Sequence, residues 1–179
     1  MITIRKAAIS DASDLAVIYK YYVDNFPYSF EYAAPDSADF ESRIAEITEF
    51  FPFFVYEKDG EILGFANAHK YREREAWKWI CETSIYVKHD ILQRGIGTAL
   101  YNELLPILKR QGFTKAFAVI GCPNTASEKF HEKMGFALLA TFPDMGYKQD
   151  SWHDVKYYVY ELNPVTAHME SPIPFVTCD

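Results

Sequence analysis

The spacing of apolar residues along the first part of the chain predicts a strand, two helices and a pair of strands. Apolar residues that recur every three or four positions indicate a helix, whereas alternation with a period of two indicates a strand. Ser10-Asp11-Ala12 offers a helix N-cap, and Asp59-Gly60 between two apolar runs is a hairpin turn signal. The expected elements are a strand over 3–7, a helix from that cap to about 24, a second helix over 37–50, and strands over 53–57 and 62–68.

The remainder of the chain predicts one more strand followed by alternating helices and strands. Pro106 lies inside the longer of the two helices, where a proline removes a backbone hydrogen bond and costs roughly 3 kcal/mol or more. We therefore expect a kink or an early end of that helix at Pro106. The expected elements are strands over 79–87 and 116–120, helices over 95–110 and 125–134, and final strands over 136–142 and 155–162.

The order of these elements is that of a mixed α/β domain of the α+β kind. A chain of 179 residues without an internal repeat fits one domain with a substantial core. We place the domain over residues 1–163 and treat 164–179 as a C-terminal extension. Three prolines in that tail lead us to expect that it lies on the surface.

Composition and charge exclude several classes of protein. The net charge of -7 disfavours general nucleic-acid binding, which needs a basic surface. No run of 18 apolar residues suggests a membrane span, and the N-terminus has no apolar signal region. Scattered histidines and three cysteines without metal-like spacing (Cys81, Cys122 and Cys178) disfavour a metal site and indicate reduced thiols in the cytoplasm.

The sharpest local signal is the segment Gln93-Arg94-Gly95-Ile96-Gly97-Thr98 between a predicted strand and a helix. Glycines allow the backbone to approach a phosphate closely, and the first N–H groups of a helix bind its negative charge. A dinucleotide fingerprint would need a third small residue where Leu100 stands, so that alternative is weak. A glycine-rich turn without a ligand remains open from this segment alone.

Several separated segments together resemble one known family. Gly95 and Gly97 match the loop Gln/Arg-x-x-Gly-x-Gly/Ala of the GNAT acetyltransferase superfamily, although Leu92 stands at its first position. Asn124-x-x-Ser127 at the start of a helix and Gly135-Phe136 after it follow in the same order. Over roughly residues 2–163 the chain also resembles the phosphinothricin acetyltransferase branch. The segments that carry this resemblance are Ile4-Arg5, Gly64-Phe65-Ala66-Asn67-Ala68, Arg72-x-Arg74-x-Ala76-Trp77, Cys81-Glu82-Thr83-Ser84-Ile85-Tyr86-Val87 and Trp152-His153-Asp154-Val155.

This resemblance implies a single GNAT-type domain with a central mixed, largely antiparallel sheet flanked by helices. It also implies acetyl-CoA as co-substrate, a small-molecule amine as acceptor and, because the branch is commonly dimeric, a homodimer. The residues that it places against acetyl-CoA are Gln93, Arg94, Gly95, Ile96, Gly97 and Thr98 at the pyrophosphate, the backbone of Ile85, Tyr86 and Val87 at the thioester carbonyl, and Asn124 and Ser127 near the pantetheine arm.

The resemblance also places two residues at the reacting atoms. Glu82 stands where family members carry a catalytic glutamate, and a carboxylate there can take the proton that a primary amine carries at neutral pH. Trp77 and Trp79 are expected to desolvate Glu82 and to raise its pKa. His131 stands at the position of a tyrosine acid in many members, and it either protonates the leaving thiolate or packs near coenzyme A.

The acceptor side is predicted from arginines and aromatic residues. A guanidinium can clamp a carboxylate with two hydrogen bonds, and the resemblance puts Arg74, with Arg72 beside it, near the substrate. Phe30 and Tyr32 are expected to form an apolar wall of the same pocket. Two alternatives stay open: a non-catalytic acyl-CoA-binding module, and an acetyltransferase that acts on another amine or on a peptide.

Overall fold

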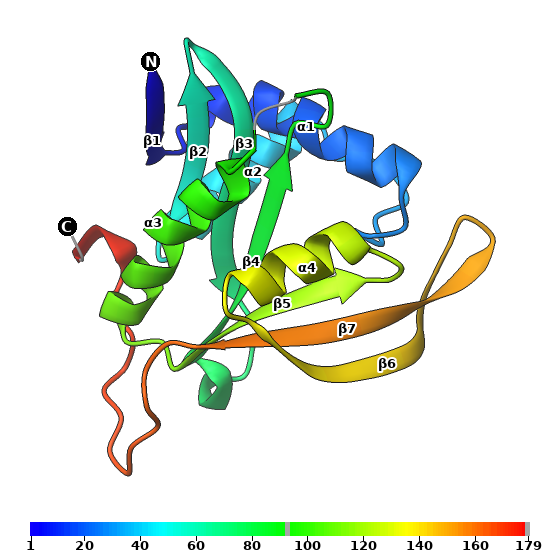
Figure 1. The fold of residues 1–179 in the computed structure, drawn as a ribbon. Coiled ribbons are helices and arrows are strands. Elements are labelled where there is room, and N and C mark those ends of the chain that lie inside the picture. The colour runs from blue at the N-terminus through cyan, green and yellow to red at the C-terminus, as the bar shows by residue number, and fades with distance from the viewer. Residues whose placement is uncertain (92–93, 178–179) are drawn as a thin grey trace.

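The computed structural model describes residues 1–91 and 94–177. The fold is built around one seven-stranded sheet (Figure 1). The order of elements predicted from the sequence is confirmed. The strands are β1 (Ile2–Lys6), β2 (Phe53–Lys58), β3 (Glu61–Lys70), β4 (Ile80–Val87), β5 (Lys115–Gly121), β6 (Ala137–Lys148) and β7 (Ser151–Glu161). The helices are α1 (Ala12–Asn25), α2 (Ser37–Thr48), α3 (Ile96–Gln111) and α4 (Thr125–Lys133).

The sheet is mixed and largely antiparallel, as expected. Its strand order is β1-β2-β3-β4-β5-β7-β6. The pair β4–β5 is parallel, whereas the other five pairs of neighbours among the described strands are antiparallel. A parallel pair needs a crossover connection, and α3 provides it between β4 and β5.

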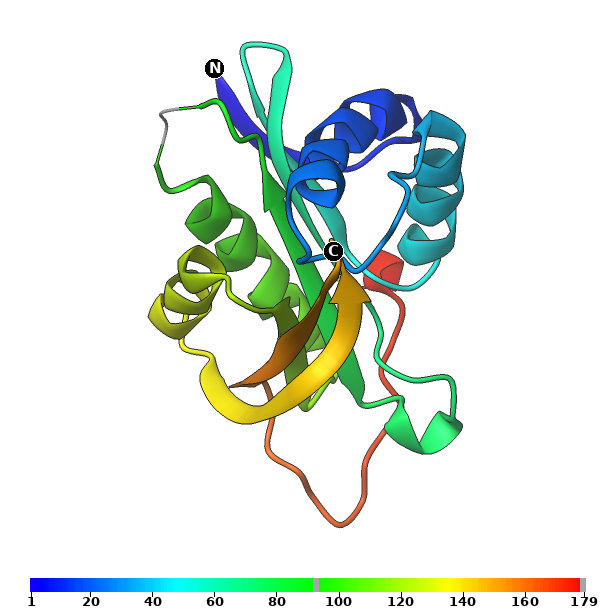
Figure 2. The same ribbon diagram turned by 90° about the vertical axis from the view of Figure 1, so that its right-hand side faces the viewer.

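Helices cover both faces of the sheet (Figure 2). Successive residues of a strand point to opposite faces, so each strand supplies side chains to two separate cores. On β3, Phe65 packs with the core of α1 and α2, whereas Ala66 and Ala68 pack with the core that contains the leucines of α3. The α1 and α2 face and the α3 face therefore have different linings, and both linings reach the site described below.

The early end expected for the helix at Pro106 is wrong, because α3 continues through this residue to Gln111. One face of the helix carries Leu104, Leu105 and Leu108, which are at most 6% exposed. Burying one leucine side chain contributes about 1.5–3 kcal/mol, so three together outweigh the cost of one proline. Pro106 itself is on the exposed face.

The C-terminal tail does not remain on the surface along its whole length, in contrast to the expectation. Phe175 is 3% exposed, and its ring centroid lies 5.7 Å from that of Phe54 on β2. The Gln111 side chain donates to the carbonyls of Phe50 and Ile173 at 2.9 Å each, and so ties the tail to the domain. Prolines in the tail indicated an extended chain but could not indicate where it docks.

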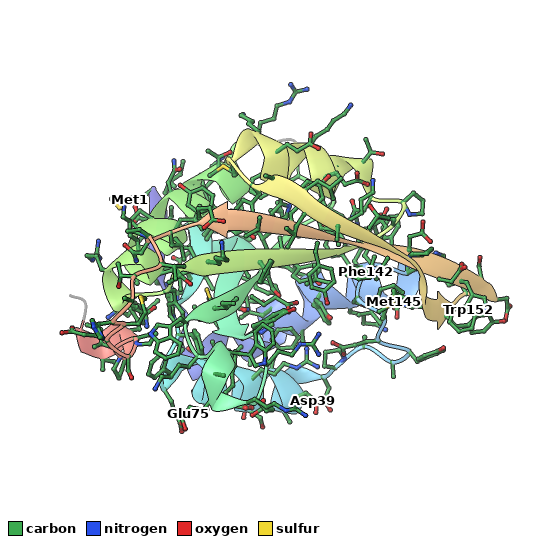
Figure 3. All side chains as sticks on the ribbon, turned by 90° about the horizontal axis from the view of Figure 1, so that it is seen from below. Met1, Asp39, Glu75, Phe142, Met145 and Trp152 are labelled. Atoms are coloured by element: carbon green, nitrogen blue, oxygen red, sulfur yellow. The ribbon has the colours of Figure 1, made fainter. Side chains whose placement is uncertain are left out.

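The last two strands form a long hairpin that extends beyond the rest of the sheet (Figure 1). β6 begins near the predicted residue but continues to Lys148, well past the expected end at 142. β6 lies at the edge of the sheet and carries large apolar side chains that are 42–58% exposed, and Figure 3 shows Met145 and Trp152 towards the far end of the hairpin. Within the described residues no helix is long and apolar enough to cross a membrane.

Candidate active site

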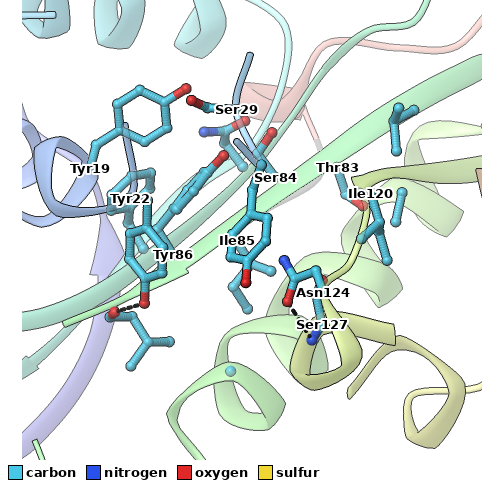
Figure 4. Close-up of a pocket in the computed structure, with 18 of the residues that line it drawn as sticks. Tyr19, Tyr22, Ser29, Thr83, Ser84, Ile85, Tyr86, Ile120, Asn124 and Ser127 are labelled. Atoms are coloured by element: carbon cyan, nitrogen blue, oxygen red, sulfur yellow. Dashed lines mark hydrogen bonds between the residues drawn. The ribbon is translucent and has the colours of Figure 1, made fainter. Parts of the chain in front are cut away.

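A pocket lies where β4 and β5 separate. β4 pairs with β5 only over Ile80–Glu82, after which β4 stays paired with β3 and β5 stays paired with β7. The two strands diverge around a pocket with a volume of about 890 Å³. In Figure 4, Ser84, Ile85 and Tyr86 line it from β4, and Asn124 lines it from the start of α4. Backbone that would otherwise be paired is thus open to a ligand.

The start of α3 forms one end of this pocket. Gly95 is the N-cap and has φ +90°, a left-handed conformation that glycine adopts without steric cost. The first bond within the helix runs from the Ala99 N–H to the Gly95 carbonyl at 2.9 Å, so the N–H groups before it have no partner in the helix. Gly95, Ile96 and Gly97 line the pocket, and such a helix terminus suits an anion such as a pyrophosphate.

Two more residues of the predicted phosphate loop, Arg94 and Thr98, flank the start of α3. Arg94 is exposed directly before the N-cap, and Thr98 is half-buried in the first turn of α3. Gln93 lies outside the described residues. The anion site is therefore carried by backbone groups from 95 onwards, with Arg94 as the nearest described positive charge in sequence.

Gly97 has a packing reason as well as its predicted place near a phosphate. A Cβ at this position would lie 3.0 Å from the ring of Phe130 on α4 and 3.2 Å from Ile85 on β4. Because such contacts are tighter than normal packing, glycine at 97 allows α3 to approach α4 and the sheet. A side chain introduced at Gly97 would disturb this packing before it reached a ligand.

The end of β4 presents backbone donors to the pocket. Backbone groups of a strand point alternately to its two edges. The Lys88 N–H donates to a β3 carbonyl at 2.8 Å, so the N–H groups of Ile85 and Val87 point to the opposite edge, where β5 has diverged. The side chain of Tyr86 points instead to α1, where its ring packs edge-on against Tyr19 with centroids 4.7 Å apart. Ile85 and Val87 are thus the donors available to a thioester carbonyl.

The start of α4 faces the same space. Asn124 is the N-cap, and its Oδ1 accepts a hydrogen bond from the Ser127 N–H at 3.2 Å. Both residues line the pocket opposite β4 (Figure 4). The cap holds the Asn124 side chain still, which leaves its amide NH₂ able to donate to a ligand.

Glu82 lies at the point where the two strands part. It stands opposite His69 on β3 and Phe117 on β5, half-buried between them and lining the pocket. Burial raises the pKa of the Glu82 carboxyl above its ordinary value, while the charges of His69 and Arg72 act in the opposite direction. A carboxylate with a raised pKa that remains in contact with a pocket is suited to accept a proton.

The two tryptophans expected to desolvate Glu82 have other neighbours. Trp77 is 43% exposed and packs against Tyr71, with ring centroids 5.8 Å apart. The ring N–H of Trp79 donates to the Glu170 carbonyl in the C-terminal tail at 2.7 Å. The burial of Glu82 follows from its place between two paired strands rather than from an indole ring.

His131 is enclosed between α3 and α4 with both ring nitrogens engaged. It is 3% exposed; Nδ1 lies 2.8 Å from the Ser127 carbonyl, and Nε2 lies 3.1 Å from the Tyr101 hydroxyl. A carbonyl only accepts, so Nδ1 carries a proton, while the Tyr101 hydroxyl beside Nε2 donates to the Thr83 hydroxyl at 3.1 Å. Burial lowers the pKa of His131, with the hydrogen bond to Ser127 opposing it. This neutral, paired ring gives the predicted acid role little support.

The two arginines predicted near the substrate are in different surroundings. Arg72 is exposed just after β3, within electrostatic reach of Glu82 and Tyr157, with its guanidinium carbon 5.1 Å from the centroid of the Tyr71 ring. Arg74 is exposed at the start of a 3₁₀ turn. Within the part of the chain that the structure describes, its side chain makes no hydrogen bond, ion pair or ring contact. The structure therefore favours Arg72 over Arg74 as the anchor for a carboxylate.

The aromatic loop after α1 forms a wall of the pocket, as predicted for Phe30. Phe30 lines the pocket with φ 56°, and its ring covers Gly146 on β6 so closely that a Cβ there would come within 2.2 Å. The expectation for Tyr32 is wrong. It is 75% exposed outside the pocket lining, and its hydroxyl donates to the Tyr147 carbonyl at 2.5 Å.

Three polar residues of the pocket floor were missed from the sequence. Asn67 and His69 on β3 face the same side as Phe65, and Ser84 lies opposite Asn67 on β4. The Ser84 hydroxyl lies 3.4 Å from Nε2 of His69. The available signal was alternation, because Asn67 and His69 occupy every second position of a strand that is otherwise mainly apolar.

A second cluster of polar side chains, also not predicted from the sequence, joins α1, α2 and the loop between them. Arg43 on α2 donates two hydrogen bonds to the Glu31 carboxylate, at 3.1 and 3.2 Å, and the Tyr19 hydroxyl donates to the same carboxylate at 2.7 Å. Burial and the Glu31 carboxylate raise the pKa of Tyr19 to about 12. Since Glu31 follows Phe30 directly, this group holds the aromatic loop against α1 and α2.

Comparison with known proteins gives the same family from the sequence and from the fold. The model of the acetyltransferase (GNAT) family matches residues 15–136. The chain is 31% identical to a phosphinothricin N-acetyltransferase of Streptomyces viridochromogenes over 157 residues, which are 88% of this chain and 86% of that protein. It is 28% identical to an L-methionine sulfoximine/L-methionine sulfone acetyltransferase of Pseudomonas paraeruginosa, over 92% of this chain and 97% of that protein.

A solved structure extends this likeness to the fold. The GNAT superfamily phosphinothricin acetyltransferase of Sinorhizobium meliloti, solved in complex with acetyl-CoA, superposes with a TM-score of 0.87 at 28% identity. The superposition covers 97% of this chain and 98% of that one.

Proposed function

The chain belongs to the acetyltransferase (GNAT) family, and from that premise we propose that it moves the acetyl group of acetyl-CoA directly to the amino group of a small, amino-acid-like acceptor. The relatives named for phosphinothricin and for methionine sulfoximine or sulfone support this acceptor class. The observation that carries the proposal is the position of Glu82, half-buried where β4 and β5 part and lining the same pocket as the open start of α3.

The residues of the pocket suit the parts of acetyl-CoA. The N–H groups at the start of α3 would hold the pyrophosphate, the Asn124 amide would meet the pantetheine arm, and the N–H groups of Ile85 and Val87 would hold the thioester oxygen. Acetyl-CoA supplies an acyl carbon whose bond to sulfur is easily broken. The chain's part is to orient that carbon and to keep the nucleophile unprotonated.

Glu82 is the proton acceptor of the proposed reaction. The carboxylate takes a proton from the acceptor ammonium, directly or through one water, and the free amine then attacks the thioester carbon. The new C–N bond forms as the C–S bond breaks and coenzyme A leaves as a thiolate. The nitrogen then gives up its second proton to become a neutral amide, and the thiolate takes up one proton to become the thiol. His131 as the donor of that proton stays a prediction, because its Nδ1 proton is already held by Ser127.

The acceptor is oriented by the rim of the pocket. Arg72, beside the entrance to Glu82, would hold a carboxylate on the acceptor, while Phe30 covers the acceptor from the loop after α1. Arg74 remains the alternative anchor proposed from the sequence. A pocket closed by an aromatic ring favours a small molecule over a peptide.

The test is an acceptor screen with the purified chain. We expect thiol release from acetyl-CoA in the presence of L-amino acids, together with an equal amount of N-acetylated amino acid by mass spectrometry. Neither product would appear with a non-catalytic acyl-CoA-binding module. A preference for polyamines or for peptide N-termini would overturn the acceptor class while leaving acetyl transfer intact.

We also propose that the chain forms a homodimer through the outer side of the β6–β7 hairpin. The support is the row of exposed apolar side chains on an edge strand, a surface that soluble monomers seldom leave uncovered. Sedimentation of the parent and of a Leu139→Lys variant would test it. A monomeric parent, or an unchanged dimer in the variant, would contradict this surface.

A further inference from the structure

One buried polar group of the pocket floor has no partner. Asn67 is 6% exposed on β3, and its Oδ1 finds no hydrogen-bond partner among residues 1–91 and 94–177. Its neighbours across the sheet are Phe53 on β2 and Ser84 on β4. Buried polar atoms are nearly always paired in native proteins, and the residue Asn67 lines the pocket, so its unpaired amide points to a ligand on that side.

Two other amides of the chain show how structural ones differ. Gln111 also has an unpaired buried oxygen, but its NH₂ group donates to two carbonyls at 2.9 Å and ties the C-terminal tail to the domain. Asn163 donates to the carbonyls of Lys109 and Phe113 at 2.8 Å each. Both amides hold backbone segments together outside the pocket, whereas the Asn67 amide makes no such hydrogen bond within the described residues.

The position of Asn67 relates it to the proposed reaction. His69 lies directly opposite Glu82, so Asn67 is the diagonal neighbour of Glu82 on the same face, a separation of about 7–8 Å between such positions. Arg72 follows the end of β3 on the other side of His69. Along the direction of β3 the three residues therefore follow in the order Asn67, Glu82 and Arg72.

Beyond Asn67 the pocket is lined by apolar side chains together with the group of Arg43, Glu31 and Tyr19 described above. Phe40, Ile47, Phe53 and Phe65 line it beneath α1 and α2. An amino acid with its carboxylate at Arg72 and its amine at Glu82 would extend its side chain into this region. The terminal torsion of an asparagine is broad and roughly two-fold, so the amide can turn either its oxygen or its NH₂ towards the end of that side chain.

We propose that Asn67 is a specificity-determining residue, whose amide hydrogen-bonds an uncharged polar group at the end of the acceptor's side chain. This inference rests on the proposed function and narrows it: the acceptor is an amino acid with a polar side-chain end rather than a simple aliphatic one. An aliphatic side chain would fill the same space and leave the amide unpaired, which costs affinity.

A matched pair of acceptors tests the parent enzyme. L-methionine sulfone and L-methionine share one skeleton and differ in the two oxygens on sulfur. The parent should show a kcat/KM about 10-fold or more higher for the sulfone, the value of one hydrogen bond to a buried group. Equal values for the two acceptors would overturn the inference.

A variant then assigns the preference to Asn67. Asn67→Leu keeps the approximate size of the side chain but removes the amide, so it should bring the sulfone-to-methionine ratio near one without changing the KM for acetyl-CoA. Asn163→Leu is the control: the same substitution at a paired amide should leave the ratio as in the parent. If Asn67→Leu retains the parent's sulfone-to-methionine ratio of kcat/KM, another residue recognises the acceptor's side chain and the inference is wrong.

Thermal stability gives a readout that does not need activity. Removing an unpaired buried amide should raise the melting temperature, by about 2–4 °C, whereas removing the paired amide in Asn163→Leu should lower it. A fall for Asn67→Leu as large as for Asn163→Leu would make Asn67 a structural residue and sink the inference. An unfolded Asn67→Leu variant would have the same meaning.

Failure of this inference is distinguishable from failure of the proposed function. A parent enzyme that acetylates the sulfone and methionine equally retains the proposed function and loses only the role of Asn67. A parent that acetylates no L-amino acid but does acetylate another amine refutes the acceptor class, and this inference with it.

Discussion

The two halves of the pocket are built in different ways. The half proposed for acetyl-CoA, which comprises the end of β4 and the starts of α3 and α4, presents mainly backbone N–H groups and two helix caps from one stretch of chain. The half proposed for the acceptor, which comprises the floor of β3 and the loop after α1, presents side chains. That loop in turn packs against the β6–β7 hairpin, more than a hundred residues away in sequence.

This difference indicates that acceptor specificity can change independently of acetyl-CoA binding. A phosphate held by backbone groups depends on local conformation and tolerates many side chains, as expected for a co-substrate shared by a whole family. An acceptor held by side chains would change with single substitutions, since Asn67 and Phe30 line different parts of the pocket and Arg72 lies within electrostatic reach of Glu82. Glu82 lies on the boundary and serves both halves.

The largest effect should come from removing the group on that boundary. Glu82→Gln retains the size of the side chain but cannot take a proton, so kcat at neutral pH should fall by about 10²- to 10⁴-fold. Affinity for acetyl-CoA, measured by calorimetry, should not change because the start of α3 is untouched. Glu73→Gln, which removes an exposed carboxylate of the connection before β4, is the control and should leave kcat as in the parent.

The next effect should be confined to the acceptor half. Arg72→Ala should raise the acceptor's KM by about 10- to 100-fold, the value of one or more charge-assisted hydrogen bonds. The KM for acetyl-CoA should remain unchanged, and Arg74→Ala is the matched comparison two residues away. A large rise for Arg74→Ala with none for Arg72→Ala would restore the anchor proposed from the sequence.

A packing change should act on the same half through the aromatic loop. Gly146→Ala places a methyl group where the Phe30 ring lies, so the ring must move and the domain should lose about 1–3 kcal/mol of stability. We expect a lower melting temperature and a raised acceptor KM with acetyl-CoA affinity intact. An unchanged acceptor KM would remove Phe30 from the pocket wall.

The smallest effect should be confined to the acetyl-CoA half. Arg94→Glu reverses an exposed charge directly before the N-cap of α3 and should raise the KM for acetyl-CoA by about 5-fold, with the acceptor KM unchanged. Arg110→Glu makes the same reversal at the far end of α3 and should have no effect on either KM. Equal effects of both variants would mean that only the net charge matters.

The sequence predicted the elements around the half proposed for acetyl-CoA because their signals are local. Glycines at 95 and 97 between a strand and a helix, a cap at Asn124 and a glutamate on a strand can each be recognised from a few neighbouring residues. Helix α3 shows the limit of local rules, since Pro106 indicated a break that the burial of several leucines overrides.

The acceptor half was predicted less well because it depends on contacts that are distant in sequence. Tyr32 and Phe30 are two residues apart, yet only Phe30 faces the pocket, and the Tyr32 hydroxyl meets a carbonyl 115 residues away. Likewise, Arg72 and Arg74 have the same charge, and only the course of the connection after β3 places one nearer Glu82. Asn67 could be identified only once its lack of a partner was visible.

The most direct test of the account is the pH dependence of kcat/KM for the acceptor in the parent and in Glu82→Gln. Burial raises the pKa of Glu82, so the parent should lose activity as the pH falls through that raised pKa and Glu82 becomes protonated. In Glu82→Gln the acid limb due to Glu82 should be absent, and the rate should follow only the fraction of free amine. The deficit of the variant should therefore shrink as the pH rises towards the pKa of the amine, whereas a constant ratio of the two rates at every pH would contradict Glu82 as the base.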